Sequence, residues 1–152
     1  RATVDRLPVA LRFPATATVL LTGNAKIRQL NRDFRGFDKA TNVLSFPQFS
    51  PAALLKLKNL SFGKSSPDSS PLELGDIALA SQYVAVEARR DGKLLIDHIT
   101  HLVIHGLLHL LGYDHEGKRE AGAMENMEIG IMNSLGLPDP YAPQPLKNKN
   151  RK

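Results

Sequence analysis

All five histidines of this chain lie between positions 98 and 115, and four of them recur at helical spacing (His98, His101, His105 and His109). Two histidines at i and i+4 lie one turn apart on a helix, so both can bind one ion, as in zinc hydrolases. One histidine on an apolar helix is usually a core residue, but five so close together indicate a metal site. Because the chain has no cysteine, the ligands must be histidines and carboxylates.

Helix geometry limits which histidines can share one ion. His101 and His109 are two turns apart, about 12 Å along the axis, which is a poor span for two ligands of one zinc. If the chain reverses at Gly112, in the left-handed conformation that glycine adopts easily, His115 can return to the ion. We therefore predict one Zn²⁺ per chain, bound by three histidines with a water in the fourth position (His105, His109 and His115). The other two are predicted to lie behind the ligands or in the core (His98 and His101).

Gly106, the residue after the first predicted ligand, helps to indicate which reaction the site could catalyse. The spacing H-x3-H-x2-G-x2-H is also that of metzincin proteases, in which a glutamate follows the first histidine. Here Gly106 holds that place and cannot accept a proton, which argues against efficient peptide hydrolysis. Zinc would still lower the pKa of a bound water to about 7. A nearby arginine could stabilise charge on a phosphoryl oxygen, as hydrolysis of a phosphodiester requires.

A helix and the turn after it must position these histidines. The segment from about Leu95 to Leu111 predicts that helix, and Gly112 ends it. The following segment, KREAGAMENMEIGIMNSLG, predicts a last helix. Its residues at helical spacing are expected to form the buried face (Ala123, Met127, Ile131 and Leu135).

The first half of the chain predicts a small sheet. Three segments rich in β-branched and apolar residues predict strands (Ala15–Thr22, Thr41–Phe46 and Leu74–Ala80). Between the first two, a helix ending at Gly36 is predicted to bury one face (Ile27, Leu30 and Phe34). Ser81 is predicted to be the N-cap of a helix that begins SQYVAVEARR. The resulting fold class is α+β, with helices packed on a small mixed sheet.

The segment from Gln48 to Glu73 is rich in proline and serine, which predicts a long loop. The apolar patch AALLKLKNL within it could form a short helix. A loop of this length in a compact domain is usually functional or mobile.

The composition of the chain indicates a globular protein and not a membrane or fibrous one. The chain has 152 residues, 42% of them hydrophobic and 23% charged, as expected for one ordinary globular domain. No apolar run approaches the ~18 residues of a membrane span. We see no signal peptide and predict a cytoplasmic protein. The chain begins with Arg1 instead of methionine, which leaves open whether residues precede it.

The net charge of +5, from 20 basic and 15 acidic residues, favours polyanionic partners such as nucleic acid. Part of the excess lies in the terminal KNKNRK (Lys147–Lys152), which is expected to be solvated and mobile. Charge alone therefore leaves nucleic acid binding open.

Three ordered blocks identify a family resemblance: LNRDFRGFDKATNVLSFP (Leu30–Pro47), LGDIALA (Leu74–Ala80) and HGLLHLLGYDH (His105–His115). The last resembles the HGxLHLxGYDH signature of the YbeY family, bacterial rRNA maturation factors and single-strand-specific endoribonucleases. The match extends in outline from Ala15 to Leu137. We expect residues 1–137 to form one hydrolase domain and residues 138–152 a proline-rich, basic and mobile tail.

The resemblance implies a zinc site at the three predicted histidines and a catalytic arginine at Arg35, facing the metal cleft. Without the family, Arg35 would be interpreted as a solvated cation at a helix end. The implied activity is zinc-dependent cleavage of single-stranded RNA, in 16S rRNA 3′-end maturation and ribosome quality control. The implied partners are rRNA, the small ribosomal subunit and ribosome-associated proteins, and no membrane. The loop from Gln48 to Glu73 is longer than is usual in the family.

Two other functions stay open from the sequence. One is a metallopeptidase of metzincin type, which the histidine spacing favours and Gly106 opposes. The other is a ribosome assembly factor in which a structural zinc has no catalytic role.

Several further polar and sulfur-containing residues have two interpretations each. Asp114 could orient a ligand or accept a proton, or it could cap the turn before His115. Three polar residues of the family blocks could act at the site or simply stabilise strand ends and turns (Asn42, Ser45 and Asp76). The three methionines downstream lie where metzincins carry a Met-turn, but their helical spacing favours core packing (Met124, Met127 and Met132).

Overall fold

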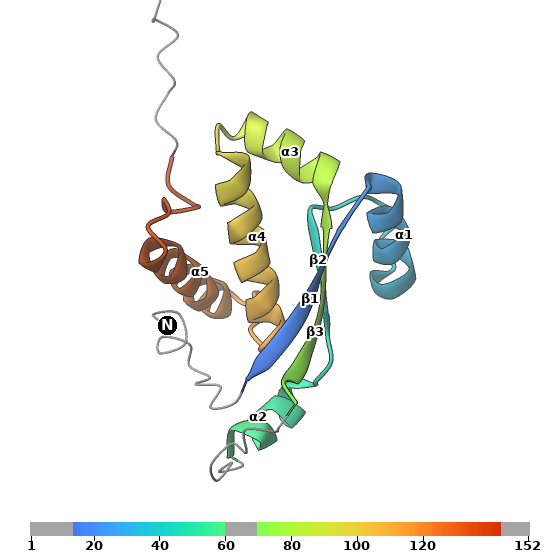
Figure 1. The fold of residues 1–152 in the computed structure, drawn as a ribbon, viewed down its shortest axis with the longest axis vertical. Coiled ribbons are helices and arrows are strands. Elements are labelled where there is room, and N and C mark those ends of the chain that lie inside the picture. The colour runs from blue at the N-terminus through green and yellow to red at the C-terminus, as the bar shows by residue number, and fades with distance from the viewer. Residues whose placement is uncertain (1–13, 60–69, 144–152) are drawn as a thin grey trace, which may run out of the picture.

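The computed structural model describes residues 14–59 and 70–143 (Figure 1). Its elements follow in the order β1 (Ala15–Thr22), α1 (Asn24–Arg35), β2 (Val43–Pro47), α2 (Pro51–Asn59), β3 (Leu72–Ala80), α3 (Ser81–Arg90), α4 (Leu95–Leu110) and α5 (Lys118–Ser134). The predicted α+β class is confirmed. The predicted strands and the histidine helix agree with β1, β2, β3 and α4 to within two residues.

The three strands form one mixed sheet in the order β1-β3-β2, with β3 parallel to β1 and antiparallel to β2. The central strand β3 is buried on both faces, which explains its nearly continuous apolar sequence. On one face Ala78 packs with Ile27 of α1. On the other, Ile77 and Leu79 belong to clusters that include side chains of α4. The sheet therefore lies between α1 and α4, and α5 packs on the far side of α4 (Figure 1).

The prediction that Ser81 caps α3 was wrong. Strand β3 continues directly into α3, so Ala80 is the N-cap residue and Ser81 is already the first helical residue. The Ser81 hydroxyl donates instead to the backbone carbonyl of Thr22, at 3.2 Å. Ser81 thus links the end of β3 to the end of β1.

The predicted buried face of α5 was right for Ile131, which is buried, and partly right for Met127, which is half-buried and packs against the core. It was wrong for the other two residues. Ala123 and Leu135 are exposed. The side chains that are buried are those of Met124, Glu128, Ile131 and Met132. A glutamate occupies the centre of this face, so a search for apolar residues alone missed it.

The predicted buried face of α1 was wrong for Phe34. Ile27 is fully buried and Leu30 partly so, but Phe34 is exposed. Its ring contacts Phe46 of β2 edge to face, with centroids 5.2 Å apart. The last turn of α1 therefore presents an aromatic side chain to solvent.

Two predicted flexible segments lie only partly within the described residues. The loop from Gln48 to Glu73 contains the expected short helix as α2, whereas residues 60–69 lie outside the described part. Residues 144–152 of the predicted tail also lie outside it. Residues 138–143 are described, and there Pro140 is buried, so this part packs against the domain. Among the described helices, none is long and apolar enough to cross a bilayer.

Helix α4 approaches the sheet closely at Gly106. A Cβ built on Gly106 would lie 3.0 Å from two side-chain carbons of Ile77, and Ile77 is fully buried in β3. Ser45 of β2 donates to the Gly106 carbonyl at 3.4 Å, across the same contact. The position that carries a glutamate in metzincins is therefore turned toward the sheet here, with no room for a longer side chain.

Replacing Gly106 with alanine should lower the free energy of unfolding by about 1 kcal/mol. Alanine gains about 1 kcal/mol in helix propensity, but overpacking a buried contact costs roughly 1–3 kcal/mol. Gly130→Ala in α5 is the matched control, because nothing lies within 4 Å of its Cβ. That variant should be more stable by about 0.5–1 kcal/mol. Urea denaturation measures both, and equal stabilisation of the two variants would contradict the packing argument.

Candidate metal centre

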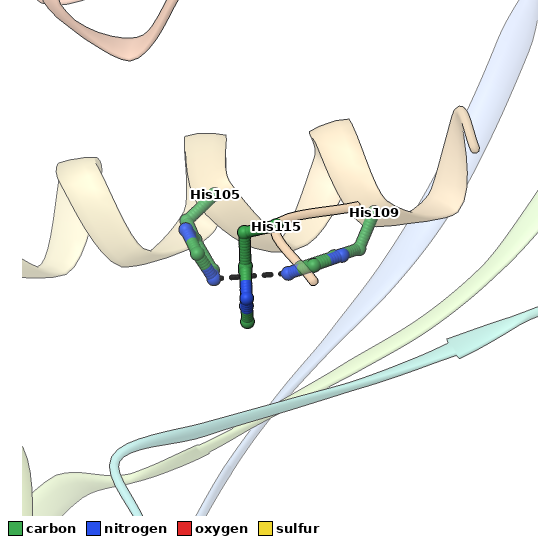
Figure 2. Close-up of side chains that lie close together, drawn as sticks. All are labelled: His105, His109 and His115. Carbon is green, nitrogen blue, oxygen red and sulfur yellow. Dashed lines mark hydrogen bonds between the residues drawn. The ribbon is translucent and has the colours of Figure 1, made fainter. Parts of the chain in front are cut away.

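Three histidines converge at the end of α4. His105 and His109 come from the last two turns of the helix, and His115 from the turn that follows (Figure 2). One ring nitrogen from each lies within 4.8 Å of the other two, an arrangement that could hold a metal ion. The structure thus groups the three residues that the sequence predicted as ligands.

The chain reverses at Gly112, where φ is 89°. The amide of Gly112 donates to the His109 carbonyl and that of Tyr113 to the Leu108 carbonyl, both at 3.0 Å. These bonds end the helix and return the chain toward it. Asp114 accepts the backbone N–H of His115 at 2.7 Å, so its carboxylate stabilises the turn that presents the third histidine.

The hydrogen bonds of the two helical histidines fix which nitrogen is available to a metal. His105 Nδ1 lies 2.7 Å from Glu128 Oε1, and His109 Nδ1 lies 2.9 Å from the Tyr113 carbonyl. A carboxylate and a carbonyl accept only, so each Nδ1 carries the hydrogen and each Nε2 a lone pair. The two Nε2 atoms lie 3.1 Å apart (Figure 2). Two zinc ligands in a tetrahedron, each about 2.0–2.1 Å from the metal, lie about 3.3 Å apart, so the donors fit that ion.

The surroundings of His109 favour its neutral imidazole, which is the form that binds a metal. Burial lowers the pKa of its imidazole, and the neighbouring His105 lowers it further. Because a metal binds neutral imidazole, the lowered pKa keeps His109 ready to bind at neutral pH.

His98 and His101 are buried behind the cluster, as predicted. His98 Nε2 lies 2.9 Å from Glu87 Oε2, which also accepts from Asn42 Nδ2 at 3.0 Å. His101 Nε2 lies 3.2 Å from Glu128 Oε1. Neither histidine contributes to the group that could hold a metal.

Glu128 is the residue that the sequence reasoning missed. Its side chain is 1% exposed and contacts His105, His101 and Tyr141. Burial alone would raise the pKa of this carboxyl, but its hydrogen bonds with these three residues outweigh burial and lower the pKa to about 2. A glutamate between Met124 and Ile131 on one helical face was the available signal, because an unpaired carboxylate is not buried.

The histidines open onto a cleft of about 600 Å³ whose other wall includes β2. Arg35, at the end of α1, lines the same cleft, and so do Phe49 and Pro51 of the long loop segment. The structure therefore places the predicted arginine and the three histidines around one space. Arg35 is exposed, with its guanidinium carbon 5.7 Å from the ring centroid of Phe37.

The other polar candidates have structural contacts. Asn42 and Ser45 line the cleft but hydrogen-bond to Glu87 and Gly106 within the fold. Asp76 is exposed and does not belong to the cleft lining. The methionines pack in or against the cluster formed by α4 and α5, which agrees with the core interpretation (Met124, Met127 and Met132).

Comparison with known proteins decides the family. The family model described as Endoribonuclease YbeY matches residues 4–136. The chain belongs to the YbeY family. The resemblance seen in the three sequence blocks is thereby confirmed.

Relatives named Endoribonuclease YbeY align over most of this chain. The relative from Nitrobacter hamburgensis is 50% identical over 130 residues, covering 86% of this chain and 63% of its own length. One from Rhodopseudomonas palustris strain BisA53 is 45% identical over 137 residues, covering 90% and 73%. One from strain CGA009 is 49% identical over 130 residues, covering 86% and 62%. The chain thus spans about two thirds of the length of these relatives.

A solution structure of TM1509 from Thermotoga maritima superimposes with a TM-score of 0.46 at 25% identity, covering 84% of this chain and 79% of that chain. The YbeY assignment rests on the sequence matches and not on this overlap.

Zinc should stabilise the folded protein, and the effect should require His109. With free Zn²⁺ at 100 times its dissociation constant, the free energy of unfolding should rise by up to about 2.7 kcal/mol. His109→Ala removes the central donor and should abolish both the thermal shift and the bound metal. Glu116→Gln is the control, because Glu116 lines the same cleft without belonging to the cluster. Equal metal content in wild type and His109→Ala would exclude this site.

Proposed function

We propose that this protein is a zinc-dependent endoribonuclease that cleaves single-stranded RNA, with a role in 16S rRNA 3′-end maturation and ribosome quality control. The observation that carries the proposal is the shared cleft, in which Arg35 and the three-histidine cluster line one space. Membership of a family whose relatives are named endoribonucleases supports the same chemistry.

His105, His109 and His115 would hold the zinc ion. When bound there, zinc would supply Lewis acidity toward water and toward a phosphoryl oxygen. The protein's own part is to bring three imidazole donors together at the edge of the cleft. Structural zinc sites usually have four protein ligands. The described residues group only three, which favours a catalytic centre over the structural zinc of a non-catalytic assembly factor.

Arg35 would bind the phosphate. Its guanidinium is always charged and has donors spaced for two phosphate oxygens. It lines the same cleft from a different element, α1, so a phosphodiester in the cleft could contact both Arg35 and the metal centre. Charge that develops on the phosphoryl oxygens would be stabilised by this cation.

The packing of Gly106 speaks against the peptidase alternative. A peptidase of metzincin type needs a glutamate at this position to move protons. Here the position contacts Ile77 of the sheet, so no carboxylate could reach the cleft from it without displacing α4.

Exposed aromatic rings beside Arg35 favour a single-stranded substrate. Phe34 and Phe37 are 68% and 52% exposed. Phe37 also has Lys39 Nζ 5.8 Å from its ring centroid, besides the Arg35 guanidinium. Bases of a single strand can stack on such rings while the cations bind the backbone, whereas a duplex hides its base faces.

The cellular setting follows from the proposed activity. The partners would be rRNA, the small ribosomal subunit and ribosome-associated proteins, and the location would be the cytoplasm. The organisation of residues 1–137 as one hydrolase domain stays a prediction.

Arg35→Glu should lower the rate of cleavage of a labelled single-stranded RNA at least about 100-fold, with zinc content unchanged. Charge reversal repels the phosphate but leaves the histidines in place. Arg89→Glu is the matched control, since Arg89 is an exposed arginine in the last turn of α3, outside the cleft lining. Full activity of the Arg35 variant would remove this residue from the mechanism. His109→Ala, purified identically, controls for contaminating ribonuclease.

Phe37→Ala should weaken binding of a short single-stranded RNA at least about fivefold, because stacking contributes roughly 1–3 kcal/mol per base. Fluorescence anisotropy measures the affinity for an ordinary oligonucleotide and for one with abasic positions. The substitution should affect only the first. Val86→Ala, at an exposed apolar position of α3, should affect neither. An equal loss for both oligonucleotides would mean that Phe37 does not stack on bases.

A further inference from the structure

Glu128 lies in the middle of α5, 1% exposed, facing α4. A buried carboxylate is unfavourable unless hydrogen bonds and opposite charges compensate for its lost hydration. Both of its oxygens have partners. Oε1 lies 2.7 Å from His105 Nδ1 and 3.2 Å from His101 Nε2, and Oε2 accepts from the Tyr141 hydroxyl. The carboxylate therefore joins α4 to the segment that follows α5.

The contact with His105 acts on the metal-facing atom of that ring. The carboxylate accepts only, so the hydrogen of His105 stays on Nδ1 and the lone pair on Nε2. Nε2 is the atom that lies 3.1 Å from His109 Nε2, at the centre of the cluster. A carboxylate behind a metal-binding histidine holds the ring in the correct orientation and increases its basicity. Glu128 itself is not among the residues that line the cleft.

Tyr141 holds Glu128 from the other side. The backbone amide of Tyr141 donates to Asp139 Oδ1 at 2.8 Å, which fixes the turn after α5. Its ring packs edge to face against His101, with centroids 5.3 Å apart. The hydroxyl then donates to Glu128 Oε2. Residues 139–141 thus cover the buried carboxylate and define the position of its second oxygen.

We propose that Glu128 is a positioning residue of the metal centre, that it orients His105 for zinc, and that Tyr141 orients Glu128 in turn. The inference rests on the metal site proposed above and does not depend on ribonuclease activity. It makes the segment after α5 part of the metal centre, although that segment contributes no ligand.

The test compares Zn²⁺ affinity in four full-length proteins by competition with a chromophoric chelator. Glu128→Gln should weaken zinc binding about 10- to 100-fold, as changes behind metal ligands do. Tyr141→Phe keeps the ring against His101 and removes one hydrogen bond to a charged group, so it should weaken binding about three- to tenfold. Glu125→Gln is the matched control, because Glu125 is exposed on the same helix, and its affinity should equal that of wild type.

A second measurement separates positioning from a general loss of stability. Nitrogen-15 NMR of the metal-free proteins should find the hydrogen of His105 on Nδ1 in wild type and a mixture of tautomers in Glu128→Gln. A purely structural role would lower the melting temperature without changing the tautomer. If Glu128→Gln does not fold, Tyr141→Phe carries the test, because its change is a single atom on a half-exposed ring.

The outcomes are distinct. Wild-type affinity in both Glu128→Gln and Tyr141→Phe would overturn this inference and leave the metal site intact. Wild-type affinity in Tyr141→Phe alone would remove Tyr141 from the proposal. A wild-type protein that binds no Zn²⁺ would overturn the metal site and this inference together. Loss of affinity in both variants with normal affinity in Glu125→Gln would establish it.

Discussion

The close contact between α4 and β3 at Gly106 is the constraint on which the rest of the site depends. Because this residue has no side chain, the helix lies against Ile77 without a gap, and Ser45 of β2 can reach the helix backbone. With one face of α4 fixed to the sheet, the faces that carry its histidines must point elsewhere. The ligand pair is left beside β2, where the cleft opens. A bulkier residue at 106 would force the helix and the sheet apart.

Helix α4 thus contacts the sheet on one side and α5 on another, and its histidines contact the buried Glu128 between them. Its sheet-facing side contributes to the core around β3, and another side packs on the methionines of α5. Between these, His101 and His105 share the buried carboxylate of Glu128. The buried carboxylate is tolerated in this interior because each of its oxygens has a partner. Helix α4 therefore combines apolar packing with a hydrogen-bonded network around Glu128. This network extends to the ring of His105, which lines the cleft.

Sequence reasoning succeeded where the determining interactions are local. The histidine group follows from i, i+4 spacing and a glycine turn, and β3 follows from an apolar run buried on both faces.

Sequence reasoning failed where a residue distant in sequence determines the local structure. Glu128 can be buried because His105 and Tyr141 contact its two oxygens. The local sequence around Glu128 does not identify these partners. For the same reason, the predicted face of α5 omitted Glu128 and included Ala123 and Leu135, which are exposed. Ser81 lost its predicted capping role because β3 pairs with β1 as far as Ala80 and runs directly into α3, so Ala80 is the N-cap residue. Arg35 was linked to the cleft by family resemblance and not by its own surroundings.

The grouping of three histidines within eleven consecutive residues has a consequence for assembly. A peptide that short could bring its imidazoles together without the sheet, so the unfolded chain would bind the proposed metal too. Ligands that bind both states stabilise the native state by less than their affinity implies. Arg35, 70 residues before His105, reaches the cleft only through the completed sheet, since loops of that length close late. On the proposed function, loading of the metal and formation of a cleft able to hold a phosphate would therefore be separate events during folding. A chain that carried the ion alone would still lack the cleft that the proposed RNA cleavage requires.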